Sequence, residues 1–459
     1  MKKVSLIISL IVSFQFLFAQ NPIGDWKGEL QVMGTKLPLI FHVKNQENQY
    51  RSTMDSPMQG AKDIPIQNTI VRNDSIIFDA SNIGIQYKAK ITDEIIEGTF
   101  IQNGMHLPLK LKRLKANESA LNRPQTPQPP FPYDNKEVII KNIIEGNTLA
   151  GTLTTPKNFD KKQPIVVSIT GSGSQNRDEE LFGHQPFLVI ADALAKKGIA
   201  SLRMDDRGIG GSEKGKDDPT TEDFAGDIAS AVNYLQQNGF ENIGLIGHSE
   251  GGMVAPMVAS KMPEIHFIVL MAAPGIPIKQ LMLQQNQAIL ADSGLSKEMQ
   301  LQSSKFNEKL YDFIINYKGT DLAVDLDKHF KSDFYAMYNQ LNEQQLEIQY
   351  TSLVKMLQSA WFQYFIQFNP EAYLSKVQCP VLALNGRLDK QVASKENLEG
   401  IRAILEKNHH KSFKIIAFDQ LNHLFQTATT GSPMEYAQIK ETMAPTVLNT
   451  IVEWIKSIK

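Results

Sequence analysis

The residues best suited to chemistry form a short glycine-flanked motif in the middle of the chain. Gly247, Ser249 and Gly251 fit the pattern G-x-S-x-G, between an apolar strand pattern at 242–246 and a helix pattern that begins at Gly251. A serine on such a strand-to-helix turn has little room, and the flanking glycines clear it so that its hydroxyl projects above the edge of a sheet. The spacing therefore predicts Ser249 as a nucleophile.

A serine hydroxyl is a poor nucleophile unless a base takes its proton. Of the nine histidines, His423 follows the strand pattern at 413–418, where the base belongs when the chain order is Ser, acid, His. The acid that orients the imidazole has two candidates. Asp389 lies in the loop after an apolar strand pattern and is the expected acid. Asp419, four residues before His423, is the rival and could instead cap a loop.

An oxyanion formed on the substrate needs two backbone N–H donors. Glu250, the residue after the nucleophile, is expected to supply one. Ser172 is expected to supply the other, because it stands between Gly171 and Gly173 in the loop that follows a buried strand pattern.

Three further side chains are candidates for contact with substrate. Gln175 and His184 belong to the long polar loop at 171–187, and internal loop bonding is an equal alternative for them. Trp361 opens the aromatic segment at 361–368, which would line a pocket or pack against the core. A separate glycine-rich stretch at 204–212 lacks the Gly-Lys-Ser/Thr ending of a phosphate loop, so Arg207 is expected to pair with a carboxylate and hold a turn.

The elements that position these residues alternate between strand and helix from residue 136 onward. Nearly continuous apolar strands in such an alternation indicate a mostly parallel sheet covered by helices on both faces, an α/β fold class. About 100 residues without a strand signal interrupt the alternation at about 277–375. An insertion of that size predicts a helical cap over the carboxyl edge of the sheet.

The part of the chain before residue 116 has a different pattern. Short alternating segments separated by turn signals at 21–115 predict an antiparallel β barrel or sandwich, faintly lipocalin-like in its number of strands. Five prolines between 122 and 135 indicate an extended, semi-rigid stretch, and residues 116–135 are predicted to be a linker. The α/β domain is then predicted at 136–459.

Residues 1–20 have the pattern of a secretory signal peptide. Lys2 and Lys3 precede an apolar run at 4–18, and Ala19 offers a small residue for cleavage. An anchor helix is the alternative, but the run is short for a membrane span. The sequence therefore predicts a periplasmic or secreted protein with no stable membrane insertion after cleavage.

Composition excludes several classes of protein. The net charge of −2 argues against nucleic acid as a partner. The single cysteine, Cys379, excludes an internal disulfide framework and a cysteine-based zinc cluster, and its place beside Pro380 at a strand start indicates core packing.

Taken together, the motifs resemble those of α/β-hydrolase-fold serine esterases, close to the bacterial esterase D type and the serine aminopeptidase-like group, over about 136–459. They are "GSGSQNRDE", "GHQPF", "DDRGIGGS", "GHSEGG", "WFQYFIQFNP", "PVLALNGRLDKQV" and "LNHLFQ". The resemblance implies an α/β-hydrolase sheet with Ser249 as nucleophile, Asp389 as acid and His423 as base, and no metal or organic cofactor. Thr170 departs from the family, since a His-Gly pair often begins the oxyanion loop.

The expected function is hydrolysis of a small-molecule carboxylic ester through an acyl-enzyme. An aminopeptidase or amidase with the same triad is one alternative. A ligand-binding protein, with a vestigial hydrolase domain and a β barrel that captures a lipid or glycan, is the other.

Overall fold

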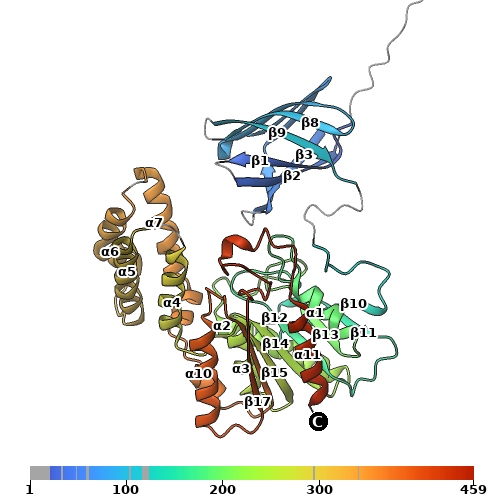
Figure 1. Cartoon of the computed structure of the whole chain (residues 1–459), viewed down its shortest axis with the longest axis vertical. Helices are drawn as coiled ribbons and strands as arrows, with labels where there is room; N and C mark the ends of the chain where they lie inside the picture. Colours follow the sequence, from blue (N-terminus) through green and yellow to red (C-terminus); the bar gives the residue numbers. More distant parts are fainter. Residues whose placement is uncertain are drawn as a thin grey trace, which may run out of the picture. The chain divides into compact units, whose positions relative to one another are not determined.

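A computed structural model describes residues 21–458, apart from 33–34, 48, 58–60, 103–104, 116–122, 293–294 and 340. The chain divides into two compact units, 1–122 and 123–459 (Figure 1). The predicted signal segment at 1–20 lies outside the described residues. Within the described part, no helix has the length and apolar character needed to cross a membrane.

The smaller unit is a nine-stranded antiparallel sheet with strand order β4-β3-β2-β1-β9-β8-β7-β6-β5. Its strands are β1 (Gly24–Val32), β2 (Thr35–Gln46), β3 (Gln49–Ser56), β4 (Ala61–Ile66), β5 (Asn68–Arg72), β6 (Ser75–Ala80), β7 (Ile85–Ile91), β8 (Ile95–Gln102) and β9 (Met105–Arg113). Alternate residues face inward, as β6 shows with buried Ile76, Phe78 and Ala80 between more exposed neighbours. The predicted antiparallel β domain is confirmed.

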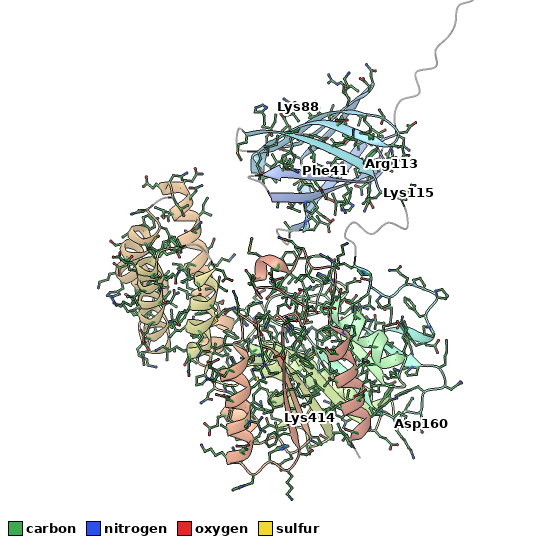
Figure 2. All side chains as sticks on the ribbon, in the orientation of Figure 1. Phe41, Lys88, Arg113, Lys115, Asp160 and Lys414 are labelled. Atoms are coloured by element: carbon green, nitrogen blue, oxygen red, sulfur yellow. The ribbon has the colours of Figure 1, made fainter. Side chains whose placement is uncertain are left out.

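Large side chains fill the interior of the smaller unit. Trp26, Phe41, Phe78, Tyr87 and Phe100 are at most 1% exposed, and the Tyr87 hydroxyl donates to the backbone carbonyl of Leu109 at 2.9 Å. Figure 2 shows Phe41 among the strands of this unit. These rings form the hydrophobic core of the smaller unit.

The larger unit is built on an eight-stranded sheet with strand order β10-β11-β13-β12-β14-β15-β16-β17. Its strands are β10 (Tyr133–Lys141), β11 (Thr148–Pro156), β12 (Ile165–Ile169), β13 (Ala200–Met204), β14 (Ile243–His248), β15 (Ile265–Met271), β16 (Val381–Gly386) and β17 (Phe413–Phe418). The pairs from β13 to β17 are parallel, whereas β10 and β11 are antiparallel. Strands β12, β13, β14 and β16 are buried along their whole length, as expected for a sheet covered on both faces.

Helices cover this sheet and form an insertion between two of its strands (Figure 1). The helices that alternate with the strands are α1 (Pro186–Ala195), α2 (Thr221–Gln237), α3 (Gly251–Ala259), α10 (Ser394–Lys407) and α11 (Pro445–Ser457). The insertion between β15 and β16 contains α4 (Ile278–Ala291), α5 (Lys297–Ile315), α6 (Leu322–Met337), α7 (Glu343–Gln358), α8 (Ala360–Ile366) and α9 (Glu371–Leu374). The predicted fold class, an α/β-hydrolase sheet with a helical insertion, is confirmed.

The predicted linker at 116–135 is wrong for residues 123–135. This stretch belongs to the larger unit, and β10 begins in it at Tyr133. The guanidinium of Arg123 is buried and donates to the carbonyl oxygens of Phe182 and Ile439, at 2.8 and 2.7 Å. Gln125 donates to the carbonyl of Met443 at 2.7 Å. Specific polar contacts therefore hold a proline-rich stretch that composition alone describes as a spacer.

Candidate active site

Ser249 occupies a strained turn between β14 and α3. Its φ of 52° lies in the left-handed region that non-glycine residues rarely adopt. A Cβ on Gly247 would lie 2.0 Å from the carbonyl oxygen of Gly251, and one on Gly251 would lie 2.2 Å from that of Ile169. Only glycine fits at these two positions, so the motif forms the expected turn with Ser249 at its tip.

His423 and Asp389 form a buried pair beside this turn. Asp389 follows β16 and His423 follows β17, and the His423 Nδ1–H donates to Asp389 Oδ2 at 2.8 Å. The other carboxylate oxygen of Asp389 accepts the backbone N–H groups of Gln391 and Val392, both at 2.8 Å. These bonds hold the acid in place, and the acid in turn fixes the orientation of the imidazole.

The rival acid, Asp419, lies elsewhere. Its carboxylate pairs with Arg387 Nε at 2.7 Å, and its side chain is 85% exposed. The geometry therefore supports Asp389, rather than Asp419, as the partner of His423.

A cavity of about 300 Å³ brings most of the predicted site residues together. Ser249 and His423 both line it, as do all the other predicted residues except Asp389, namely Ser172, Gln175, His184, Glu250 and Trp361. Apolar side chains of the helical insertion complete the wall, namely Leu281, Met282, Met356, Phe362 and Phe365. Among the lining residues, all in the described part of the chain, there is no lysine or arginine.

The two expected oxyanion donors face this cavity from different elements. Ser172 belongs to the loop after β12, and Glu250 is the residue that precedes α3. The neighbouring Gly171 N–H is engaged, since it donates to Glu179 Oε1 at 2.6 Å. Across the described residues, neither the Ser172 N–H nor the Glu250 N–H donates to a protein acceptor. Both donors are therefore available to a substrate oxygen.

The side chain of Glu250 links the turn to the helical insertion. Its Oε1 accepts the Thr221 hydroxyl at 2.7 Å and the Trp361 indole N–H at 2.9 Å. Burial raises the pKa of this carboxyl above its ordinary value. Trp361 thus lines the cavity with its ring, as expected of a substrate contact, but its N–H is committed to Glu250.

The structure gives His184 a different role from the predicted substrate contact. The ring lines the cavity but is 1% exposed. Its Nε2–H donates to the Tyr436 carbonyl at 3.1 Å, and its Nδ1 pairs with the Thr442 hydroxyl at 2.9 Å. Burial lowers the pKa of His184 to about 4, so the ring is neutral at physiological pH. Both nitrogens are used within the protein, which makes His184 a residue that holds the loop.

Gln175 and the residues around Asp206 hold the loop that carries Ser172. Asp206 accepts the Thr170 hydroxyl and the Gln175 backbone N–H, both at 2.8 Å. The Gln175 amide donates to the Ser172 carbonyl at 3.4 Å. Gln175 therefore contributes to the loop itself as well as to the cavity wall.

The prediction for Arg207 is confirmed. Its guanidinium donates to both carboxylate oxygens of Asp227, at 2.8 and 2.9 Å, and to Glu145 at 2.8 Å. Cys379 is half-buried, and burial raises the pKa of its thiol to about 12, so the thiol is not ionised at neutral pH.

Two buried residues beside the site were not predicted. Glu179 bonds to Gly171 and to His248, the residue before the nucleophile, and His248 in turn bonds to the backbone of His423. His248 also lines the cavity. No local pattern marks Glu179, because its partners lie far from it along the chain.

The chain is similar to a known protein family and to several characterised proteins. The model of the family described as serine aminopeptidase, S33, matches residues 185–427. Esterase EstD of Thermotoga maritima is 25% identical over 329 residues, which are 70% of this chain and 69% of that protein. The esterase Pf2001 of Pyrococcus furiosus superposes with a TM-score of 0.44 at 16% identity, covering 74% of this chain and 97% of the other. Est1E of Butyrivibrio proteoclasticus, solved with ferulic acid bound, gives 0.41 at 18% identity, covering 70% and 98%.

Proposed function

The chain belongs to the serine aminopeptidase S33 family of hydrolases, and from that premise we propose that it cleaves carboxylic esters through Ser249, His423 and Asp389. The observation that carries the proposal is the buried His423–Asp389 pair, which shares one cavity with a serine held in a strained turn. The similarity to esterase EstD supports an ester as the substrate.

The positions of these groups support the following reaction. Ser249 Oγ attacks the ester carbonyl while His423 Nε2 takes the hydroxyl proton, since Nδ1 is held by Asp389. The N–H groups of Ser172 and Glu250 donate hydrogen bonds to the carbonyl oxygen and stabilise the negative charge that develops on it. His423 returns the proton to the leaving alcohol, and the acyl group remains on Ser249. A water deprotonated by His423 then attacks the acyl group, and His423 returns that proton to Ser249 Oγ as the carboxylic acid leaves.

The cavity suits a small, uncharged acyl group. Its wall is largely apolar, and it offers no lysine or arginine among its described lining residues to neutralise a carboxylate.

Hydrolysis of an aminoacyl amide is the second candidate, and the family description favours it. A free amine would need an acidic partner in the cavity, and Glu250 and Glu179 are present there. Both carboxylates already accept hydrogen bonds from protein groups, so an amine would have to compete for them. Esters are therefore the better-supported substrates.

The site of action is proposed to be outside the cytoplasm. The proposal is supported by the basic start at Lys2 and Lys3, the apolar run at 4–18 and the small residue Ala19. Expression of the full chain with detection of the mature N-terminus in the periplasmic fraction tests it; a cytoplasmic chain that keeps Met1 would contradict it.

A fluorophosphonate probe and a pair of substrate series test the proposed reaction. We expect the probe to label Ser249, and p-nitrophenyl esters to be turned over in preference to aminoacyl p-nitroanilides. Absence of labelling would end the proposal of a serine nucleophile. Turnover of the anilides alone would transfer the assignment to the aminopeptidase candidate.

A further inference from the structure

We propose that Glu179 and His248 form a second acid–histidine pair that positions the oxyanion loop and the loop of His423 for the reaction. Neither residue reacts with substrate in this proposal; both are positioning residues. The inference rests on the proposed function, because it concerns the rate of the step that Ser249 and His423 perform.

Glu179 joins the oxyanion loop to the nucleophile turn through a single oxygen. Its side chain is 8% exposed, and its backbone φ of 53° is left-handed. Oε1 accepts the Gly171 N–H at 2.6 Å and the His248 Nδ1–H at 2.9 Å. Because Gly171 is occupied in this way, the next N–H along the loop, that of Ser172, is the one left for the substrate oxygen.

The contact between this loop and the nucleophile is close. A Cβ built on Gly171 would lie 3.1 Å from Glu179 Oε1 and 3.2 Å from Ser249 Cβ. A small shift of Glu179 would therefore move the backbone donor relative to the serine.

His248 carries the connection onward to the base. Its Nε2–H donates to the backbone carbonyl of His423 at 3.0 Å, and the two imidazole rings are 4.8 Å apart. The His423 carbonyl can only accept, which places a proton on Nε2, and Nδ1 lies against the Glu179 carboxylate. Burial lowers the pKa of His248, but Glu179, with smaller contributions from the His423 carbonyl and Asp389, outweighs burial and raises the pKa above its ordinary value, which favours the form protonated on both nitrogens.

The resulting chain of bonds runs from Gly171 through Glu179 and His248 to His423. It connects an oxyanion donor loop with the general base across the nucleophile turn, so both are positioned relative to Ser249. Misplacement of reacting groups by about 1 Å can cost about 100-fold in rate. Loss of either partner should therefore lower kcat more than it raises KM.

Glu179→Gln tests the proposal against a matched control in the same loop, Asp178→Asn. Asp178 pairs with the buried Arg203 and does not line the cavity, so its substitution removes an ion pair without removing a cavity residue. Turnover of a p-nitrophenyl ester is measured per active site, counted with a fluorophosphonate probe. We expect Glu179→Gln to lower kcat about 30-fold or more with KM within about threefold. Asp178→Asn should leave kcat within about twofold while lowering the melting temperature.

Two isosteric substitutions at His248 test the two bonds separately. The amide nitrogen of asparagine takes the place of Nδ1, so His248→Asn keeps the bond to Glu179 and loses that to His423. His248→Gln keeps the bond to His423 and loses that to Glu179. We expect each substitution to lower kcat at least about tenfold. The double variant Glu179→Gln/His248→Gln should have a kcat only slightly below that of the worse single variant, because the two residues act as one unit.

The proposal is overturned by any of three results. The first is a kcat of Glu179→Gln within about threefold of wild type. The second is a loss of kcat in Asp178→Asn as large as that in Glu179→Gln. The third is a wild-type kcat in either His248 variant. If Glu179→Gln does not fold, the His248 variants decide alone. A wild type that neither reacts with the probe nor turns over esters would instead refute the proposed function, before any variant is compared.

Discussion

At the residue scale, the choice of acid illustrates what distinguishes an active-site carboxylate from a surface one. Asp389 and Asp419 both precede His423 in the chain and both follow strands. Asp389 is buried and bonds through both oxygens, to the imidazole and to two backbone N–H groups. Asp419 is exposed and pairs with Arg387. A carboxylate stabilises an imidazolium strongly only where water does not screen it.

Substitutions at the triad positions and at Asp419 should differ by orders of magnitude in their effect on kcat. Ser249→Ala and His423→Ala should each lower kcat about 10⁴-fold or more, because the nucleophile or its base is lost. Asp389→Asn should lower kcat more than about tenfold, since an amide stabilises the imidazolium poorly. Asp419→Asn is the control and should stay within about twofold. Steady-state kinetics with one p-nitrophenyl ester check all four; a greater loss in Asp419→Asn than in Asp389→Asn would show that the acid is wrongly assigned.

The sequence predicts the residues whose chemistry is local and misses those whose roles depend on distant partners. Ser249 can be recognised from Gly247 and Gly251, which are close to it in sequence as well as in space. His184 has the residue type of a ligand contact, but its partners lie more than 250 residues away. Glu179 likewise meets His248 across 69 positions. Only folding shows which polar side chains remain available for substrate.

At the element scale, a charged cluster joins the first three strands of the smaller unit. His42 on β2 bonds to Asp25 on β1 at 2.7 Å and to Asp55 on β3 at 3.1 Å. The bond to Asp55, opposed by burial and reinforced by the bond to Asp25, raises the pKa of His42 from 6.5 to about 9. The protonated ring thus connects neighbouring strands that also share a ladder of backbone hydrogen bonds.

This cluster predicts a pH-dependent stability. A raised pKa means that the folded chain binds the proton more tightly, so the stabilisation is complete below pH 6.5 and is lost as the pH rises through about 9. Calorimetry of wild type and His42→Gln at about pH 6 and about pH 10 measures it. The melting temperatures should differ at the lower pH and converge at the higher one. A difference that persists unchanged at the higher pH would contradict the assignment.

The helical insertion provides the part of the cavity that limits the acyl group. Met282 on α4 lines the cavity and is half-buried, so a larger side chain there can be accommodated without disrupting the core. Met282→Trp should lower kcat/KM for p-nitrophenyl octanoate at least about tenfold. The kcat/KM for p-nitrophenyl acetate should stay within about threefold of the wild-type value. Glu298→Gln, on the exposed start of α5, is the control. Equal effects on both esters would place the acyl group elsewhere.

Periodicity predicts most of the elements, and the misses have physical causes. The buried strands β12, β14 and β16 are largely apolar runs of five or six residues. Such runs are too short for a buried helix, so the pattern predicts strands. Strands β4 and β5 are short and mix polar with apolar residues, so their pairing depends on neighbours in the sheet. The stretch at 123–135 was predicted as a spacer from its prolines, whereas Arg123 and Gln125 fasten it to the larger unit.

At the scale of the whole molecule, the candidate site belongs to the larger unit alone. All residues of the candidate site, from Gly171 to Thr442, come from the larger unit. The smaller unit has its own core of aromatic and aliphatic side chains, separate from the two clusters of the larger one.

A chain that begins at Arg123 should therefore retain the hydrolase. It keeps both hydrophobic clusters of the larger unit, the proline-rich stretch with Arg123 itself, and every residue that lines the cavity. We expect its kcat and KM for a soluble p-nitrophenyl ester to stay within about twofold of those of the longer chain that begins at Asn21. A chain that begins at Val138 is the informative comparison, because it lacks Arg123, Gln125 and the first half of β10, and should lose thermal stability. If removal of residues 21–122 alone abolished turnover in a folded protein, the smaller unit would have to contribute to the reaction itself.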